Sequence, residues 1–549
     1  MADGRLHSME TTAESARHAR LRSIAWATTT IEETPRVDRE EIAKMDYAEL
    51  KGALQSGSVT ALAALCSTLE KALLLHMKTN CVVLFLEDAA NIAREWDRKA
   101  ADAAFVKPPL FGIPFSDKES IPMKGRPNTR GGVHAIIAEE DHGLINAVRR
   151  NGGVPFALTN VPLSLMTYET TNGVFGTTTN PHRSDCSPGG SSGGEGAMIG
   201  GGAAHLGFGS DYGGSIRIPS SYCGNAGYKP TAQRLSLNSY QYDIPGRPFI
   251  GITDGPMSTT IQACVDVLKL TWSNRSEHHR DPYIPPVDWQ EDLFCEGRNY
   301  TIGVMNHVAD YITSSGQIRA IAMARKVLEN AGHTVIDFNP PDLSKLVHLL
   351  QSMILTDGGA MYARWLDAEL VPDVFKEMHR YFGMSADEKA KQADQFEKAG
   401  EHRAARLYRA IHRSPADVQQ GMFDVYSFRN AFVKAMREQG IDAILGPTTL
   451  TPALRCGTPL QLLLDTVVPT FIYNLLDFGA GCIPMGKWTS EDTAGMVDYP
   501  ETDNMERTLK RECLDADGLP LSVQVSVPPF RDEVALRILC DLETHAKGF

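Results

Sequence analysis

"CSPGGSSGGEGAMIGGGAAHLGFGSDYGGSIRIPSS", residues 186–221, is made mainly of glycine, alanine and serine, with few charges and a single histidine. Three explanations fit such a composition. The glycines could surround a phosphate group, form a flexible linker, or leave room for the backbone to close around a nucleophile. Each explanation predicts different neighbouring residues, so the sequence can be used to choose between them.

A phosphate-binding loop is not predicted. A Walker loop needs GxxxxGK followed by serine or threonine, because the lysine reaches the phosphates and the hydroxyl holds magnesium. Residues 186–221 contain no lysine and no GxGxxG pattern. The nearest match elsewhere, "GCIPMGKW" at 481–488, has Trp488 where the hydroxyl is needed.

A flexible linker is not predicted either. The segment 193–211, "GGEGAMIGGGAAHLGFGSD", places alanine, methionine, isoleucine, leucine and phenylalanine between its glycines. Linkers usually lack such apolar content, whereas glycine inside a packed element lets two backbones approach closely. We therefore expect a closely packed, buried helix in this segment.

The third explanation is a nucleophile site centred on Ser215, which follows two glycines in "SDYGGSIRIP". Consecutive backbone N–H groups in such a turn can form an oxyanion hole. A nucleophilic serine also needs a base. The only histidine of the segment, His205, is interpreted as a packed core residue, and the GxSxG elbow of α/β-hydrolases is absent around Ser215. Upstream, "PPLFGIPFSDKES" places Lys118 at the end of an apolar strand, where burial would lower the lysine pKa.

The bulk composition is that of an ordinary soluble globular protein. The chain has 549 residues, 42% hydrophobic and 22% charged, with a formal net charge of −13. An acidic balance argues against a general nucleic-acid binder. The ten cysteines form neither a CxxC pair nor a zinc-like group. The N-terminal residues lack the apolar core of a secretory signal, and no apolar run is long enough to span a membrane.

Strand and helix patterns alternate along the chain, which predicts an α/β architecture. Examples of strand followed by helix are "NCVVLFLEDAANIAREWDRKAADAA" from Asn80 and "LPLSVQVSVPPFRDEVALRILCDLE" from Leu519. We expect residues 1–75 to form an N-terminal helical segment packed on a catalytic body formed by residues 76–549. The charge-rich stretch 381–415 is interpreted as a solvated helical face or lid.

Taken together, these residues closely resemble the amidase signature family. The resemblance rests on "SPGGSSGGEGAMIGGGAAHLGFGSDYGGSIRIPSSYCGNAGYKPT" with "GIPFSDKES" upstream, and on "ALTNVPLSLMTYETTNGVFGTTTNPH", "YNLLDFGAGCIP" and "LPLSVQVSVPPFRDEVALRIL". It extends from about residue 75 to the C-terminus. Within the family, the sequence is most similar to eukaryotic fatty acid amide hydrolases and related fungal amidases. The resemblance implies a large twisted mixed β-sheet surrounded by α-helices.

The resemblance also implies a Ser-cisSer-Lys triad. Ser215 would be the nucleophile, Ser191 a bridging serine on a cis peptide, and Lys118 the base. The oxyanion would be held by the backbone N–H groups of four residues of the turn: Tyr212, Gly213, Gly214 and Ser215. No metal or organic cofactor is implied.

Residues around the triad are given supporting roles. The resemblance implies that Ser192, Asp211 and Arg217 hold the loops by hydrogen bonds. Leu165, Met166 and Tyr168, just before the signature, are candidates for an acyl-binding pocket, with plain core packing as the alternative.

Two departures from the mammalian fatty acid amide hydrolase bear on the substrate. That enzyme has an N-terminal membrane helix and an apolar membrane-docking cap. This sequence has no such apolar helix, and the corresponding cap region is the charged 381–415 stretch. Insertion into a membrane and a strictly lipid-amide substrate are therefore open questions.

The first hypothesis is a serine amidohydrolase acting on acyl amides, such as fatty acid amides or N-acylethanolamines. An amidase for short-chain or aryl amides would use the same chemistry. An amidotransferase subunit supplying ammonia to a charged tRNA, or a non-catalytic scaffold, are alternatives from other classes. We expect a small-molecule amide substrate, no nucleic-acid partner, a cytoplasmic location with peripheral membrane contact open, and, by analogy with the family, a homodimer.

Overall fold

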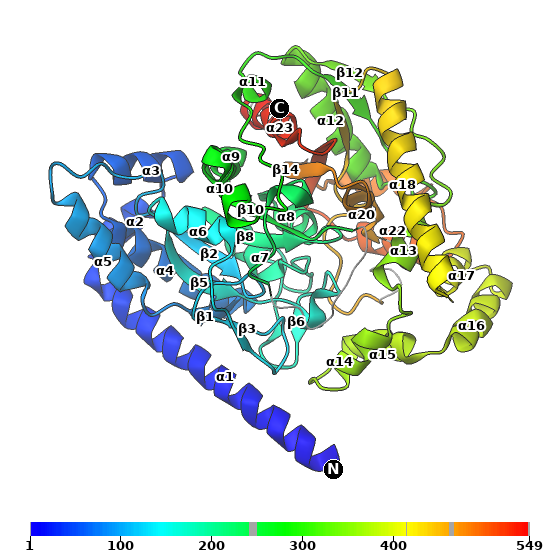
Figure 1. Ribbon diagram of the computed structural model, residues 1–549, viewed down its shortest axis with the longest axis horizontal. Helices are drawn as coiled ribbons and strands as arrows, with labels where there is room; N and C mark the ends of the chain where they lie inside the picture. Colours follow the sequence, from blue (N-terminus) through cyan, green and yellow to red (C-terminus); the bar gives the residue numbers. More distant parts are fainter. Residues whose placement is uncertain (1, 241–249, 413, 460–465, 547–549) are drawn as a thin grey trace.

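A mixed β-sheet of 11 strands runs through the centre of the molecule (Figure 1). The computed structural model describes residues 2–240, 250–412, 414–459 and 466–546. The central strands are short apolar runs with every residue buried, such as "VPFALT" and "PLSVQVSV". Burial of both faces explains why "VPFALT" is almost continuously apolar, whereas "PLSVQVSV" keeps three buried polar residues, Ser522, Gln524 and Ser526. In their order across the sheet, the strands are β1 (Val82–Phe85), β5 (Val154–Thr159), β2 (Pro114–Lys118), β8 (Leu206–Asp211), β10 (Thr253–Ser258), β9 (Ala226–Lys229), β14 (Gly479–Lys487), β15 (Pro520–Val527), β13 (Ala443–Pro447), β11 (Thr301–Val304) and β12 (Thr334–Asp337).

Parallel and antiparallel pairs both occur in this sheet. Strand β2 is parallel to its neighbours β5 and β8, and β11 is parallel to β12 and β13. The strands between these two groups pair in antiparallel fashion, including β8 with β10 and β14 with β15. The prediction of an α/β fold with a large mixed sheet surrounded by helices is confirmed.

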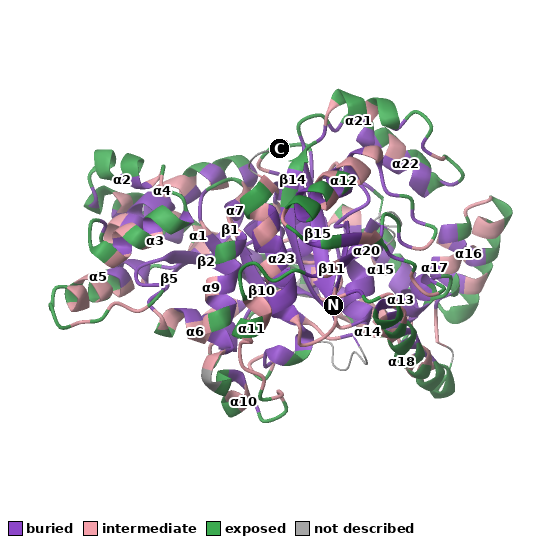
Figure 2. Cartoon of the chain, turned by 90° about the horizontal axis from the view of Figure 1, so that it is seen from above, coloured by how far each residue is buried: buried purple, intermediate pink, exposed green. Residues whose placement is uncertain are grey.

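Helices cover the sheet, and the burial pattern places the most buried residues at its centre (Figure 2). Two short hairpins, β3 (Pro127–Asn128) with β4 (Ile136–Ile137) and β6 (Thr171–Asn172) with β7 (Gly176–Thr177), lie outside the sheet. The α-helices are α1 (Ala2–Thr30), α2 (Arg36–Ile42), α3 (Tyr47–Ser56), α4 (Ala61–Thr79), α5 (Ala89–Ala100), α6 (Gly143–Arg150), α7 (Gly193–Gly200), α8 (Arg217–Cys223), α9 (Ile261–Thr271), α10 (Ser276–Arg280), α11 (Glu291–Phe294), α12 (Ser315–Asn330), α13 (Leu346–Ile354), α14 (Ala360–Leu366), α15 (Lys376–Gly383), α16 (Ala386–Lys398), α17 (His402–Arg409), α18 (Pro415–Glu438), α20 (Val468–Leu475), α21 (Ser490–Gly495), α22 (Asn504–Cys513) and α23 (Asp532–His545).

The N-terminal helices pack against the β1 side of the sheet (Figure 1). On α1, Arg17 Nε donates to the carbonyl oxygen of Val174 at 2.8 Å, and Ser23 Oγ accepts from the backbone N–H of Phe85 at 3.1 Å. A division of the chain at residue 75 would cut α4. This helix packs on α1, α5 and α7, and so connects the N-terminal segment to the body.

The segment 193–211 differs from the expected single helix. Helix α7 ends at Gly200, and residues 206–211 form strand β8. Gly202 adopts φ +73°, a conformation that an α-helix cannot continue, so the chain turns there. Strand β8 then gains backbone hydrogen bonds from β2 on one side and β10 on the other. The glycines do mark a closely packed segment. The prediction that the helix continues after Gly202 is wrong, because residues 206–211 form strand β8.

The charge-rich stretch 381–415 is largely helical, as predicted. Helix α16 packs on α17, and Arg403 is buried against Asp503 and Glu506. These ion pairs hold α17 to α22 and the loop before it. This part of the stretch is therefore packed on the body rather than fully solvated.

Candidate active site

Lys118 stands at the end of β2 and is fully buried. Its Nζ atom lies 2.8 Å from Ser191 Oγ and 2.8 Å from Ser210 Oγ. The backbone carbonyl oxygen of Ser210 is 3.4 Å away. The parallel pairing of β2 with β8 brings the lysine beside Ser210, while Ser191 comes from the loop that precedes α7. The structure thus brings together two of the three predicted triad residues by direct contact.

Burial changes the chemistry of this lysine. Removal from water disfavours the ammonium form and lowers the pKa of Lys118 from 10.5 to about 7. The negative charges of Asp254, Asp211, Asp117 and Glu195 act in the opposite direction and raise it. Burial is the larger effect, so a substantial fraction of Lys118 is neutral near neutral pH and able to accept a proton.

Ser191 follows a cis peptide bond between Gly190 and Ser191, as the family resemblance implies. A Cβ atom on Gly190 would lie 2.5 Å from the carbonyl oxygen of Thr167. Glycine is therefore required where this loop passes the neighbouring backbone. The next residue on this loop, Ser191, contacts Lys118.

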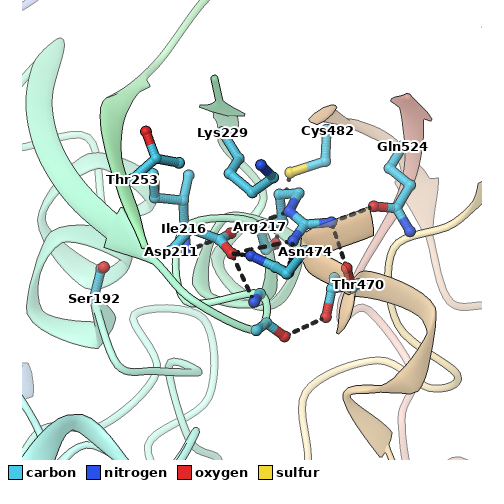
Figure 3. A network of polar contacts seen from close by, with 12 residues as sticks. Ser192, Asp211, Ile216, Arg217, Lys229, Thr253, Thr470, Asn474, Cys482 and Gln524 are labelled. Carbon is cyan, nitrogen blue, oxygen red and sulfur yellow. Dashed lines mark hydrogen bonds and ion pairs between the residues drawn. The ribbon is translucent and has the colours of Figure 1, made fainter. Parts of the chain in front are cut away.

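The turn from Asp211 to Arg217 presents Ser215, and a carboxylate organises it (Figure 3). Asp211 Oδ1 accepts from the backbone N–H of Gly214 at 2.8 Å, and Oδ2 accepts from that of Ile216 at 3.2 Å. Arg217 forms a buried ion pair with the same carboxylate, with Nε 3.1 Å from Oδ2. Burial alone would raise the pKa of Asp211, but Arg217 and the other donors lower it to about 2. Asp211 contacts the turn directly, and Arg217 contacts Asp211.

Not every N–H group of the turn is available for an oxyanion. The N–H of Gly214 donates to Asp211. By contrast, within the described part of the chain the N–H groups of Gly213 and Ser215 donate to no protein acceptor. The four predicted donors are therefore not equivalent, because the Gly214 N–H holds the turn itself.

Ser192 connects the two serine loops. Its backbone N–H donates to the carbonyl oxygen of Ser215 at 3.1 Å, and its Oγ donates to the carbonyl oxygen of Ser210 at 3.4 Å. Ser191 and Ser215 both line one cavity. The hydrogen bonds between described residues do not include a direct one between the Ser191 and Ser215 hydroxyls. The loops that carry the two serines are therefore connected by the hydrogen bond from the Ser192 N–H to the Ser215 carbonyl oxygen, not by a bond between the two hydroxyls.

The cavity next to the serines has a volume of about 370 Å³, within the usual range for a small-molecule site. The three residues predicted for an acyl pocket, Leu165, Met166 and Tyr168, all line it. None of the described residues lining it is a histidine, and none comes from 381–415. The apolar part of its lining also includes Ile218, Leu237, Ile250, Ile252, Ile354, Trp365, Val467 and Phe471.

His205 lies outside this cavity. Its Nδ1 atom is 3.1 Å from Thr259 Oγ1, and burial lowers the His205 pKa to about 4. This histidine is therefore neutral and structural, in agreement with its interpretation as a core residue.

Several residues of the site were not predicted. Ser210 contacts Lys118, and its position directly before the "DYGGS" turn was the available signal. Thr470 and Asn474 on α20 bond to the nucleophile turn from the C-terminal third of the chain. Asn474 stands in "YNLLDFGAGCIP", which supported the resemblance without suggesting a role for this residue.

Buried carboxyl groups surround the lysine. Asp254 accepts from Tyr240 OH at 2.7 Å and lies 3.3 Å from His142 Nε2. Burial raises the pKa of Glu195 to about 8, although Ser116 and Thr159 donate to it. Asp117 is fully buried, and no described side chain donates to either carboxyl oxygen. Burial and the neighbouring Glu195 raise its pKa well above the ordinary value.

A buried lysine of lowered pKa, beside serine hydroxyls at one end of an apolar cavity, is typical of an enzyme active site. The comparisons with known proteins identify the class. The family model described as Amidase matches residues 63–536. A fatty acid amide hydrolase 1 of Caenorhabditis elegans is 34% identical over 517 residues, covering 93% of this chain and 90% of the relative. A fatty-acid amide hydrolase 1 of Sus scrofa is 29% identical, covering 93% of this chain and 87% of the relative.

Solved structures show the same fold. A fatty acid amide hydrolase superposes with a TM-score of 0.82 at 22% identity, covering 100% of this chain and 96% of that one. A peptide amidase from Stenotrophomonas maltophilia superposes with a TM-score of 0.66 at 18% identity, covering 92% of this chain and 97% of that one.

The chain belongs to the amidase family, and its chemistry is hydrolysis of amide bonds. Among its described residues, no helix has both the length and the apolar character needed to cross a membrane.

Proposed function

We propose that this chain hydrolyses acyl amides, such as fatty acid amides or N-acylethanolamines, to a free acid and an amine through an acyl-enzyme. The observation that carries the proposal is the 2.8 Å contact between the buried Lys118 Nζ and Ser191 Oγ, beside a cavity that Ser215 also lines. The apolar lining of that cavity fits an acyl chain. Two relatives named as fatty acid amide hydrolases support the substrate class.

In the proposed mechanism, neutral Lys118 takes a proton from Ser191, and Ser191 takes one from Ser215. Ser215 Oγ attacks the amide carbonyl carbon, and the electron pair of the carbonyl moves onto its oxygen. Collapse of this intermediate breaks the C–N bond, while the proton returns through Ser191 to the leaving amine. Water then attacks the acyl-enzyme by the same proton path and releases the acid.

The negative oxygen of the intermediate needs donors held in advance. Of the four predicted donors, we assign this role to Tyr212, Gly213 and Ser215, because the Gly214 N–H already donates to Asp211. The hydrogen bond from the Gly214 N–H to Asp211 keeps the turn in a conformation in which the N–H groups of Gly213 and Ser215 can face the oxyanion.

A hydrolysis screen over acyl chain length tests the proposal. Purified enzyme is given acetamide, butyramide, octanamide and oleamide, with the Ser215→Ala variant as the matched control. We expect a preference for the long-chain amides, and no hydrolysis by the variant. A preference for acetamide would overturn the lipid-amide substrate, since a short or aryl amide would then be the better fit.

Labelling by a fluorophosphonate tests the nucleophile separately. The wild-type protein should be labelled at Ser215, and Ser215→Ala should not be labelled. Labelling that persists in this variant would overturn the assignment of Ser215 while leaving the substrate class to the hydrolysis screen.

A further inference from the structure

Helix α20 contacts both the cavity and the nucleophile turn. Val467, directly before the helix, and Phe471 line the cavity. Thr470 and Asn474, four residues apart and therefore on one face of the helix, bond to the turn from Asp211 to Arg217 (Figure 3). One short helix therefore touches the place where an acyl chain would lie and the place where the nucleophile is held.

Thr470 fixes one peptide unit of the turn. Its Oγ1 donates to the carbonyl oxygen of Gly213 at 2.8 Å, sharing its proton with the carbonyl oxygen of Val467. The N–H of the same peptide unit, that of Gly214, donates to Asp211. The plane of this peptide is therefore held from both sides, which sets the directions of the Gly213 and Ser215 N–H groups next to it.

Asn474 bonds to Asp211 and Arg217, the ion pair that holds the turn. Its Nδ2 donates to Asp211 Oδ1 at 2.8 Å, and its Oδ1 accepts from Arg217 Nη2 at 2.7 Å. Arg217 Nη1 also donates to the Thr470 carbonyl oxygen at 2.9 Å. Asp211, Arg217 and Asn474 are all buried, so water does not compete for these bonds. The whole network is visible in Figure 3.

On the cavity side, Phe471 packs against the same turn. Its ring lies edge-on to Tyr212, with 6.1 Å between ring centroids. A Cβ atom on Gly213 would be 3.3 Å from the Phe471 ring. An acyl chain in contact with Phe471 and Val467 would therefore press α20 onto the turn that carries Ser215.

We propose that α20 couples the filling of the acyl cavity to the position of the nucleophile turn, with Thr470 and Asn474 as positioning residues. This inference rests on the proposed function. An acyl chain gains its contacts with Phe471 and Val467 only while the helix is seated on the turn, so it favours the arrangement in which the turn is held. Binding energy from a remote part of the substrate is then used to orient the reacting groups, and truncated substrates lose kcat as well as affinity.

The test measures kcat and KM separately for oleamide and butyramide. In the wild-type protein, we expect the ratio of kcat for oleamide to kcat for butyramide to be about tenfold or more, the effect of one net hydrogen bond. In Thr470→Val, which removes the hydroxyl, this ratio should fall close to one, while KM still decreases with chain length. Thr470→Ser keeps the hydroxyl and should restore the ratio.

Other results would overturn the coupling. A kcat that falls by the same factor for both amides in Thr470→Val would mean that the residue supports the turn without sensing the chain. A wild-type kcat that does not depend on chain length would overturn the coupling and leave amide hydrolysis intact. Failure to hydrolyse any amide would overturn the proposed function instead.

A second variant keeps the test decisive if Thr470→Val does not fold, as judged by its circular dichroism and thermal melting. Phe471→Leu leaves the hydrogen bonds of α20 in place and shortens the contact with the chain. It should lower the oleamide-to-butyramide ratio of kcat. An unchanged ratio in a folded Phe471→Leu protein would overturn the inference.

Discussion

Lys118 Nζ lies 2.8 Å from Ser191 Oγ, although the two residues are 73 positions apart in the sequence. Strand β2 ends at the lysine, and the loop before α7 brings the serine to it. A lysine placed in water would be protonated at neutral pH. This lysine instead contacts two serine hydroxyls and has no exposure to solvent. The protonation state of Lys118 can therefore be tested through the pH dependence of the reaction.

The first prediction concerns the pH dependence of hydrolysis. Because burial lowers the Lys118 pKa to about 7, and the neutral form is the base, kcat/KM should rise with pH through about 7. At pH 6 it should be about tenfold below its plateau. The measurement is a pH profile of kcat/KM with a neutral amide substrate. Activity that stays constant from pH 5 to 9 would contradict the role of Lys118 as base.

The second prediction concerns Asp254, whose negative charge raises the Lys118 pKa. Its partner across the antiparallel β8–β10 pair is Ser210, which contacts Lys118 directly. Removal of the charge in Asp254→Asn should lower the Lys118 pKa, so the rising limb of the profile should move to lower pH. Tyr240→Phe, which removes a hydrogen bond to Asp254 but keeps its charge, is the matched control. A limb that moves to higher pH in Asp254→Asn would refute this account.

The third prediction compares two neighbouring glycines. Gly214 has φ +125°, and a Cβ atom on it would overlap Thr470 Oγ1. Gly214→Ala should therefore displace the oxyanion donors and lower kcat by about 100-fold or more. The nearest atoms to a Cβ atom on Gly213 would be those of the Phe471 ring, at 3.3 Å or more.

Gly213→Ala is thus the control, and it should retain activity within about tenfold, since a displacement of a few tenths of an ångström relieves the contact. Steady-state kinetics and fluorophosphonate labelling of both variants provide the measurement. Equal activity of the two variants would show that the turn does not depend on the conformation of Gly214.

The fourth prediction concerns Asp117, a buried carboxyl group with no side-chain donor among the described residues. Leucine has the same branched shape without the polar atoms. Asp117→Leu should therefore raise the free energy of unfolding by about 1–3 kcal/mol at neutral pH. Urea denaturation at several pH values would measure this difference.

The pH dependence of that gain has a definite sign. The folded-state pKa of Asp117 is raised above its unfolded value, so folding takes up a proton at this group, and its contribution to stability falls as pH rises above about 4. The advantage of Asp117→Leu should accordingly be larger at pH 8 than at pH 5. Asp117→Asn, which does not titrate, should lose the pH dependence. A destabilised Asp117→Leu protein would show that the carboxyl group has a partner role.

The elements that carry Lys118 and Ser215 could be predicted from local sequence, whereas Ser191 is assigned only through the family resemblance. The lysine ends an apolar run bounded by prolines, and such a run is predicted as a strand from its own residues. The glycines before Ser215 likewise predict a tight turn. The boundary between α7 and β8 could not be predicted, because it depends on strand pairing with β2 and β10, which lie elsewhere in the sequence.

The contacts that hold the turn could not be predicted for the same reason. Thr470 Oγ1 meets the Gly213 carbonyl oxygen across 257 positions, and Asn474 meets Asp211 across 263. A threonine and an asparagine in an apolar helix give no local sign of their partners. Similarly, the backbone N–H groups of residues 212–215 look equivalent in the sequence. Only the fold shows that the Gly214 N–H donates to Asp211.

The network around Arg217 also bears on how the protein is synthesised. Lys118, Ser191 and Ser215 leave the ribosome well before Asn474 and Gln524, which supply hydrogen-bond acceptors to the buried guanidinium. Until these acceptors have emerged, Arg217 has Asp211 as its ion-pair partner but lacks the rest of the buried network that holds the turn. We expect nascent chains to remain inactive until the strand that carries Gln524 has emerged. Hydrolytic activity would then appear only after most of the chain has been synthesised.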